Sequence, residues 1–143
     1  MRRKLLGAAL AVSSIAGMNV FSAGPAQAAA TASPCPNQSG VASACLFYHS
    51  RANSLGAWYV QLDNVSDYDI PKRYFLAGPY GSGGAGQEVK NNAAAVENMG
   101  PFTFTVYYNS RFSCAVACQQ FAPLLGPKDL NSVMKNENAS GGW

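Results

Sequence analysis

The chain has 143 residues, four cysteines and a formal net charge of +3, and this length suits one domain but not two well-filled cores. Three of its ten basic residues, Arg2, Arg3 and Lys4, lie in an N-terminal leader that has no acidic residue. The rest of the chain is therefore formally neutral and has no basic stripe that could neutralise phosphates. We therefore expect no nucleic-acid partner.

Residues 1–30 have the features of a secretory signal peptide. The basic start is followed by apolar stretches at 5–12 and 15–20 and by small-x-small cleavage sites at 26–28 and 28–30. The alternative interpretation is an uncleaved membrane anchor. The apolar region is too short and too rich in Gly and Ser to favour such a permanent membrane span. We expect residues 31–143 to be released as a secreted, extracellular protein without membrane contact after signal cleavage.

Exported cysteines meet an oxidising environment, so the four cysteines predict two disulfides. Three pairings are possible, and proximity in the sequence favours Cys35–Cys45 and Cys114–Cys118. Each short bridge should stabilise the fold by only about 2–3 kcal/mol, and its main use is to shape the chain locally. A zinc site is the rival interpretation, but neither pair has a suitably spaced partner pair, and the only histidine is His49.

The first half of the secreted chain begins with an irregular lead-in at 31–40. β-Branched and aromatic residues then predict strands at 45–49, 57–62 and 87–91. A turn at 51–56 joins the first two strands. We expect a connection at 63–74, with room for one helical turn, and a flexible glycine-rich loop at 78–86.

The second half has a similar plan. Strands are predicted at 102–108, 118–122 and 131–135, with the cysteine turn between the first two and a Pro/Gly connection at 123–128. No stretch of the secreted chain has a convincing helical period. Short strands separated by turn residues indicate an all-β sandwich or barrel.

An internal repeat supports two similar halves. Residues 47–51 (Phe-Tyr-His-Ser-Arg) align with 107–111 (Tyr-Tyr-Asn-Ser-Arg), and 90–94 (Lys-Asn-Asn-Ala-Ala) align more loosely with 135–139 (Lys-Asn-Glu-Asn-Ala). Two such units packed face to face would bury aromatic side chains between two sheets. The expected core aromatics are Tyr48, Trp58, Tyr59, Phe102, Phe104, Tyr107 and Phe121.

The sequences Val-Lys-Asn-Asn-Ala-Ala at 89–94, Val-Tyr-Tyr-Asn-Ser at 106–110 and Lys-Asn-Glu-Asn-Ala-Ser at 135–140 resemble the family I36 peptidase inhibitors of actinomycetes. The start of the family pattern fits residues 45–48 and 56–59, and the resemblance covers 35–143. It implies one secreted βγ-crystallin-like domain at 31–143, built as two Greek keys at about 44–99 and 102–143. Some members of the family inhibit metalloproteinases of the thermolysin type.

The chain departs from this pattern around its cysteines. The first pair is more widely spaced than usual, and a cysteine loop replaces the double glycine that is common after Tyr-Asn-Ser. The characterised metalloproteinase inhibitor of the family has a similar disulfide-closed loop, with cysteines one residue further apart, and presents a Cys–hydrophobic bond to the protease. The resemblance therefore implies a reactive loop made of Cys114, Ala115, Val116, Ala117 and Cys118.

A physical reason supports the same loop. A disulfide removes conformational entropy before binding, which raises the affinity of an extended segment for an active site. The small apolar side chains of Ala115, Val116 and Ala117 suit a hydrophobic specificity pocket, and their exposure would indicate a partner surface. The alternative is a structural staple at the hairpin, with these side chains partly packed.

A second candidate site would bind calcium. Crystallin-like Greek keys sometimes hold calcium in an (Asn/Asp)-(Asn/Asp)-x-x-(Ser/Thr)-Ser loop. The segment at 91–96 keeps two amides and lacks both hydroxyls, whereas the later segment offers Asn136, Glu137 and Ser140. Calcium prefers several oxygen ligands with carboxylates among them, so we expect weak binding or none. Side-chain hydrogen bonds that hold a turn are the alternative role.

Catalysis is not expected, and no cofactor is implied. A bridged cysteine is no nucleophile, and His49 aligns with Asn109 at a turn. Asp63, Asp67 and Asp69 form a small acidic cluster to which the sequence brings no second catalytic group. The loop at 78–86 lacks the Gly-Lys-Ser/Thr ending of a phosphate loop.

These features predict a secreted, monomeric peptidase inhibitor whose partner is a secreted protease, with a thermolysin-type metalloproteinase favoured. The alternative is a secreted crystallin-like structural or weakly calcium-binding protein without inhibitory activity.

Overall fold

The computed structural model describes residues 35–36 and 41–143, so the predicted signal peptide at 1–30 lies outside the described residues. The described residues form antiparallel β-strands and one short 3-10 helix, η1 (Arg51–Asn53). The all-β expectation is confirmed.

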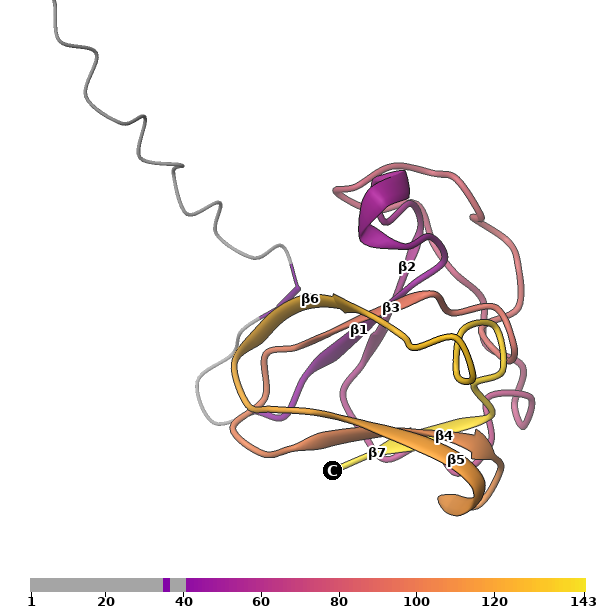
Figure 1. The fold of residues 1–143 in the computed structure, drawn as a ribbon. Coiled ribbons are helices and arrows are strands. Elements are labelled where there is room, and N and C mark those ends of the chain that lie inside the picture. The colour runs from indigo at the N-terminus through magenta and orange to yellow at the C-terminus, as the bar shows by residue number, and fades with distance from the viewer. Residues whose placement is uncertain (1–34, 37–40) are drawn as a thin grey trace, which may run out of the picture. The chain divides into compact units, whose positions relative to one another are not determined.

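The strands belong to two sheets, which Figure 1 shows as two layers. The four-stranded sheet has the order β2-β1-β3-β6 and consists of β1 (Ala44–Phe47), β2 (Trp58–Gln61), β3 (Ala95–Asn98) and β6 (Leu125–Asp129). The three-stranded sheet has the order β5-β4-β7 and consists of β4 (Phe104–Asn109), β5 (Ser113–Phe121) and β7 (Ser140–Gly142).

Each half of the chain contributes to the sheet of the other half. Strand β6 comes from the second half but pairs with β3, for example Val96 with Lys128. In return, Val65 of the first half forms an antiparallel bridge with Gly141 of β7. The two halves of the chain are therefore tied together by backbone hydrogen bonds within both sheets, as well as by their common core.

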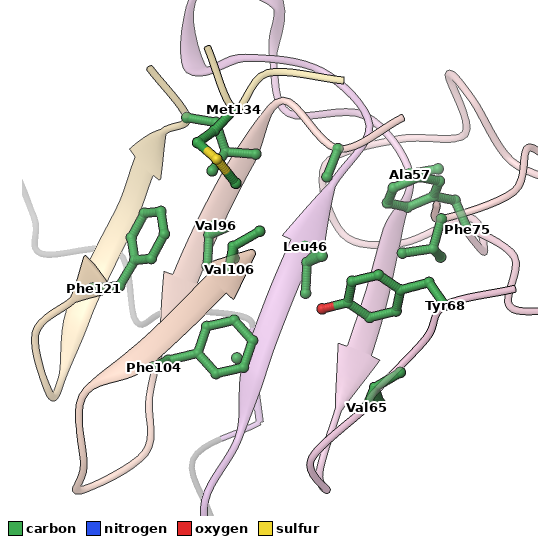
Figure 2. Close-up of a cluster of buried hydrophobic side chains, with 14 residues drawn as sticks. Leu46, Ala57, Val65, Tyr68, Phe75, Val96, Phe104, Val106, Phe121 and Met134 are labelled. Carbon is green, nitrogen blue, oxygen red and sulfur yellow. The ribbon is translucent and has the colours of Figure 1, made fainter. Parts of the chain in front are cut away.

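The main core lies between the two sheets. Leu46 and Val96 of the four-stranded sheet and Phe104, Val106 and Phe121 of the three-stranded sheet are fully buried, and Figure 2 shows these side chains gathered between the strands. Burying each side chain of this size contributes about 1.5–3 kcal/mol to the free energy of unfolding. This contact area is the reason why the two layers stay together.

The structure bears out the internal repeat. Asn91 and Asn136 occupy equivalent positions, and both have a left-handed backbone, with φ of 59° and 61°. The amide of Asn91 donates to the carbonyl of Asn138, and the amide of Asn136 donates to the carbonyl of Ala93, each at 2.8 Å. Because Ala93 and Asn138 are also equivalent, these two bonds are exchanged reciprocally between the halves. We call residues 90–92 and 135–137 the paired asparagine turns.

The side chain of Asn138 reinforces this junction. It is fully buried, its Oδ1 accepts from the amide of Ala93 at 2.9 Å, and its Nδ2 donates to the carbonyl of Val89 at 2.8 Å. An amide that is buried with both ends bonded links the halves without leaving an unsatisfied polar group.

The strand register is also equivalent in the two halves. Phe47 lies opposite Ala95 in one sheet, and Tyr107 lies opposite Ser140 in the other. The predicted strands at 45–49, 57–62 and 102–108 correspond to β1, β2 and β4, with ends that differ by up to two residues.

Other predicted boundaries are wrong. Residues 87–91 form only an isolated bridge, between Glu88 and Tyr74, and then a turn, and the predicted last strand at 131–135 is a series of turns. The predicted strand at 118–122 is only the end of the longer β5, and the expected connection at 123–128 contains most of β6. Strands β3 and β7 were not predicted. The alanines of β3 and the glycines of β7 have low β-propensity, and pairing with β1 and β4 overrides it.

The aromatic core is smaller than expected. Phe104 and Phe121 are fully buried, whereas Tyr48 and Tyr59 pack against the core from partly exposed positions. Trp58 packs on a second cluster, and Tyr107 is half-buried. The prediction for Phe102 is wrong, because its side chain is 64% exposed in the segment before β4.

The glycine-rich segment at 78–86, expected to be flexible, lies closely against aromatic rings. A Cβ on Gly78 would come within 2.5 Å of the Trp58 ring, and a Cβ on Gly84 within 2.1 Å of the Tyr48 ring. The glycines are therefore needed because their missing side chains let the backbone approach these rings.

Gly78→Ala should destabilise the fold by about 1–3 kcal/mol, because the new methyl group overlaps the Trp58 ring and one of them must move. Urea denaturation measures this change. Gly126→Ala is the matched control, since a Cβ there meets nothing within 4 Å, and its free energy of unfolding should stay within about 0.5 kcal/mol of the parent. Equal stabilities of the two variants would contradict this packing.

Candidate functional site

The predicted reactive loop lies in a bulge of the β4–β5 hairpin. Tyr107 pairs with Cys118 and Asn109 pairs with Ser113. One residue of β4, Tyr108, therefore lies opposite the four residues 114–117 of β5. Extra residues on one strand force it to bend away from its partner, so the sequence between the cysteines projects from the hairpin.

A disulfide closes this bulge. Cys114 and Cys118 are bonded with their Cα atoms 5.1 Å apart, and Cys35 and Cys45 form the other disulfide with a Cα separation of 5.9 Å. Both predicted pairings are confirmed, and no cysteine of the described residues is free. The cysteines lie inside one strand, β5, and the hairpin turn comes before them.

The bulge presents apolar side chains to solvent. Cys114 and Ala115 are exposed, Val116 is 61% exposed, and Ala117 is partly buried against the core. Strand β5 is also an outer strand of its sheet. A branched apolar side chain is thus exposed in the bulge of an outer strand, where a binding partner can reach it.

The strand just after the loop is held by Gln119. Its Nε2 donates to the carbonyl of Asp129 at 3.3 Å, and its Oε1 accepts from the amide of Asn131 at 2.8 Å. These bonds fix the C-terminal end of the loop to the last residue of β6 and to the segment that follows it. No local pattern indicates this role, because the partners are ten and twelve residues away and their positions depend on β6.

The turn before the loop is also constrained. Arg111 and Phe112 both have a left-handed backbone, with φ of 62° and 59°, a conformation that non-glycine residues adopt at a cost. The amide of Arg111 donates to the carbonyl of Ser66, and the amide of Phe112 donates to Ser140 Oγ at 3.2 Å. The Phe112 ring meets the Tyr107 ring edge to face at 5.7 Å.

Asp67 ties this turn to the first half of the chain. Its carboxylate accepts from Ser110 Oγ at 2.8 Å, from Lys90 Nζ at 2.9 Å and from the Asp69 amide at 2.9 Å. Partial burial favours the neutral acid, but these donors together lower the pKa of Asp67 below its usual value. Of the three aspartates predicted as a cluster, Asp67 therefore has a structural role at the base of the hairpin.

A hollow of about 210 Å³ lies beside the hairpin. It is lined by Tyr107 and Phe112 of the hairpin and by Asn64, Gly142 and Trp143. Asn64 Oδ1 accepts from the Trp143 amide at 2.8 Å, so the C-terminal residue is held in this wall. The hollow adds a mixed apolar and polar surface next to the loop.

One of the calcium candidates already has its hydroxyl engaged within the fold. Ser140 is fully buried in β7, where its hydroxyl donates to the carbonyl of Asn109 at 2.7 Å and accepts from Phe112. Asn136 belongs to the paired asparagine turns and is exposed, and Glu137 is half-buried. In residues 35–36 and 41–143, no three His, Cys, Asp or Glu side chains are placed to hold a metal ion.

His49 lies in the turn region predicted for it. Its ring contacts the Tyr48 ring at 4.8 Å and lies against Gly83 of the glycine-rich segment. No acidic side chain hydrogen-bonds to it within the described part of the chain.

Comparison of the chain with protein-family models, with curated proteins and with solved structures finds no match. Among the described residues, no helix has the length and apolar character needed to cross a membrane.

Asp67→Asn should lower the free energy of unfolding at neutral pH by about 1–3 kcal/mol, since it weakens hydrogen bonds to a charged acceptor. A carboxylate whose pKa is lowered by folding stabilises the protein above the unfolded-state value of about 3.9. This contribution is lost as the pH falls through the folded-state pKa, so the gap between variant and parent should close in acid. Urea denaturation across this pH range measures the gap.

The control is Asp63→Asn, because Asp63 is exposed and its carboxylate makes no hydrogen bond or ion pair with the described residues. A gap for Asp67→Asn that is independent of pH, or equal to that of Asp63→Asn, would contradict the role of the Asp67 carboxylate.

Proposed function

We propose that the chain is a secreted peptidase inhibitor that binds a protease through the disulfide-closed loop Cys114–Cys118. It acts by binding and not by catalysis, as a monomer, and its partner is a secreted protease. The preference for a thermolysin-type metalloproteinase as the target comes from the resemblance to the family I36 inhibitors.

The strand order supports a βγ-crystallin-like domain of two Greek keys. In a Greek key the fourth strand returns to lie beside the first. Strand β3, which ends the first half, lies beside β1, and β7, which ends the second half, lies beside β4. The third element of each half pairs with a strand of the other half. The segment at Val65 pairs with β7, and strand β6 pairs with β3. The boundaries at 44–99 and 102–143 agree with this division.

The observation that carries the inhibitor proposal is the exposed bulge on an outer strand. A protease binds its substrate as an extended segment, in the manner of a strand added to a sheet edge. The loop presents such a segment with its ends fixed by the Cys114–Cys118 bond and by Gln119. Since little conformational freedom remains to be lost on binding, the affinity rises.

The side chains of the loop agree with a hydrophobic specificity pocket. Val116 offers a branched apolar group that is 61% exposed, and its neighbours Ala115 and Ala117 are too small to obstruct it. Burying a side chain of this size in a partner is favourable by about 1.5–3 kcal/mol.

Secretion is supported by the leader and by the two disulfides, which persist in oxidising compartments. A protein released in this way meets secreted proteases, so the compartment fits the proposed partner.

Val116→Asp tests the proposal. The purified secreted chain at micromolar concentration should inhibit at least one member of a panel of metallo, serine and cysteine proteases. The variant should inhibit it roughly 30–1,000-fold less well, because a charge in an apolar pocket costs about 2–4 kcal/mol. Steady-state inhibition constants measure this ratio.

Leu124→Asp is the matched control. Leu124 is 64% exposed and lies beyond the other end of β5, so this variant should inhibit as well as the parent. Cys114→Ser/Cys118→Ser should keep the fold, as judged by circular dichroism, and lose inhibition. If the parent inhibits no protease of the panel, or if Val116→Asp inhibits equally well, the proposal is wrong, and the alternative of a crystallin-like structural protein stands.

A further inference from the structure

A second concave site lies away from the loop, between the first hairpin turn and the later asparagine turn. This pocket of about 270 Å³ is lined by residues that include His49, Ser50, Asn53, Lys135 and Asn136. None of the reactive-loop residues lines it. The lining residues include one cation, Lys135, together with amide and hydroxyl side chains, and none of them is an aspartate or a glutamate.

Two hydrogen-bond donors in the pocket are available to a ligand. Among the described residues, no carboxylate lies within ion-pair distance of Lys135. Ser50 is only 8% exposed, and its Oγ accepts from Asn53 Nδ2 at 3.2 Å. This leaves the hydroxyl hydrogen of Ser50 to be donated.

The internal repeat shows what this pair of donors binds elsewhere in the same molecule. Ser50 is equivalent to Ser110, and Lys135 is equivalent to Lys90. In that second copy, Ser110 Oγ and Lys90 Nζ both donate to the carboxylate of Asp67, at 2.8 and 2.9 Å. One copy of the site is therefore filled by a carboxylate from the chain itself.

The first copy has no such carboxylate because the corresponding side chain has another partner. The amide of Leu130 donates to the carbonyl of Ala94, and the amide of Tyr68 donates to the carbonyl of Ala139. Because Ala94 and Ala139 are equivalent in the repeat, Leu130 is the counterpart of Tyr68. The residue before each of them, Asp129 or Asp67, is therefore also equivalent. Asp129 Oδ1 accepts from the backbone amide of Arg51 at 2.8 Å, and Asp129 is not part of the pocket lining.

We propose that the pocket binds the carboxylate group of a small acid or of an acidic peptide side chain. The ligand carboxylate takes the place that Asp67 occupies in the other copy, and it accepts from Ser50 and Lys135. The amides of Asn53 and Asn136 border the rest of the ligand. The volume suits a group of a few heavy atoms, and the positive charge of Lys135 favours an anion over a calcium ion in the same space.

NMR titration of the isotope-labelled secreted chain tests this site at low ionic strength. The probes are succinate, as a free acid, and a blocked tripeptide with one aspartate, as a peptide source. Calcium chloride is a third arm. At least one carboxylate probe should give saturable shifts at Ser50, Asn53 and Asn136, and calcium should give none there. The probe that binds more tightly identifies the source.

Lys135→Gln should weaken binding by about tenfold or more, because a charge-assisted hydrogen bond is lost. Lys128→Gln is the control, since Lys128 is exposed in β6 and lines no part of the pocket, and it should bind like the parent. The proposal is overturned if neither carboxylate saturates by tens of millimolar, if Lys135→Gln and Lys128→Gln bind alike, or if calcium gives the saturable shifts. Protease inhibition by Lys135→Gln should be unchanged, so this test is independent of the inhibitor proposal.

Discussion

The reciprocal hydrogen bonding of the paired asparagine turns is the constraint on which the rest of the structure depends. Asn91 donates to Asn138 and Asn136 donates to Ala93, while the buried Asn138 side chain joins Ala93 to Val89. These bonds set where β3 and β7 begin, and therefore the register in which each half pairs with its own first strand. The exchange of β6 and the Val65 segment between the sheets follows from the same pseudo-twofold arrangement.

This repeated scaffold explains where the two candidate sites lie, because both are departures from the repeat. The first hairpin has no counterpart of the disulfide-closed bulge, so the residues between Cys114 and Cys118 are not part of the repeated plan. The pocket at Ser50 and Lys135 lacks the carboxylate that Asp67 supplies to the other copy. Shared features hold the molecule together, and both proposed binding sites lie where the two halves differ.

Local signals in the sequence are sufficient for part of this structure. Cysteine spacing predicted both disulfides, and aromatic and β-branched runs predicted β1, β2 and β4. The Lys-Asn repeat identified equivalent segments of the two halves, but these were expected to be strands and are turns. The strands β3, β6 and β7 were missed because Ala, Gly and Pro have weak β-propensity, and these strands form through pairing with distant partners. The supports of the candidate site were missed for a similar reason. The partners of Gln119 are positioned by β6, which pairs with β3, and Asp67 reaches Ser110 only after the two halves dock.

Hydrogen–deuterium exchange tests the proposed binding surface most directly. Exchange is measured for the secreted chain alone and in complex with a catalytically inactive variant of the protease that it inhibits. Amides of residues 113–119 should exchange more slowly in the complex, whereas those of the first hairpin turn at 50–56 should be unaffected. Unchanged exchange at 113–119, with protection elsewhere or nowhere, would contradict the assignment of the bulged loop as the surface that binds the protease.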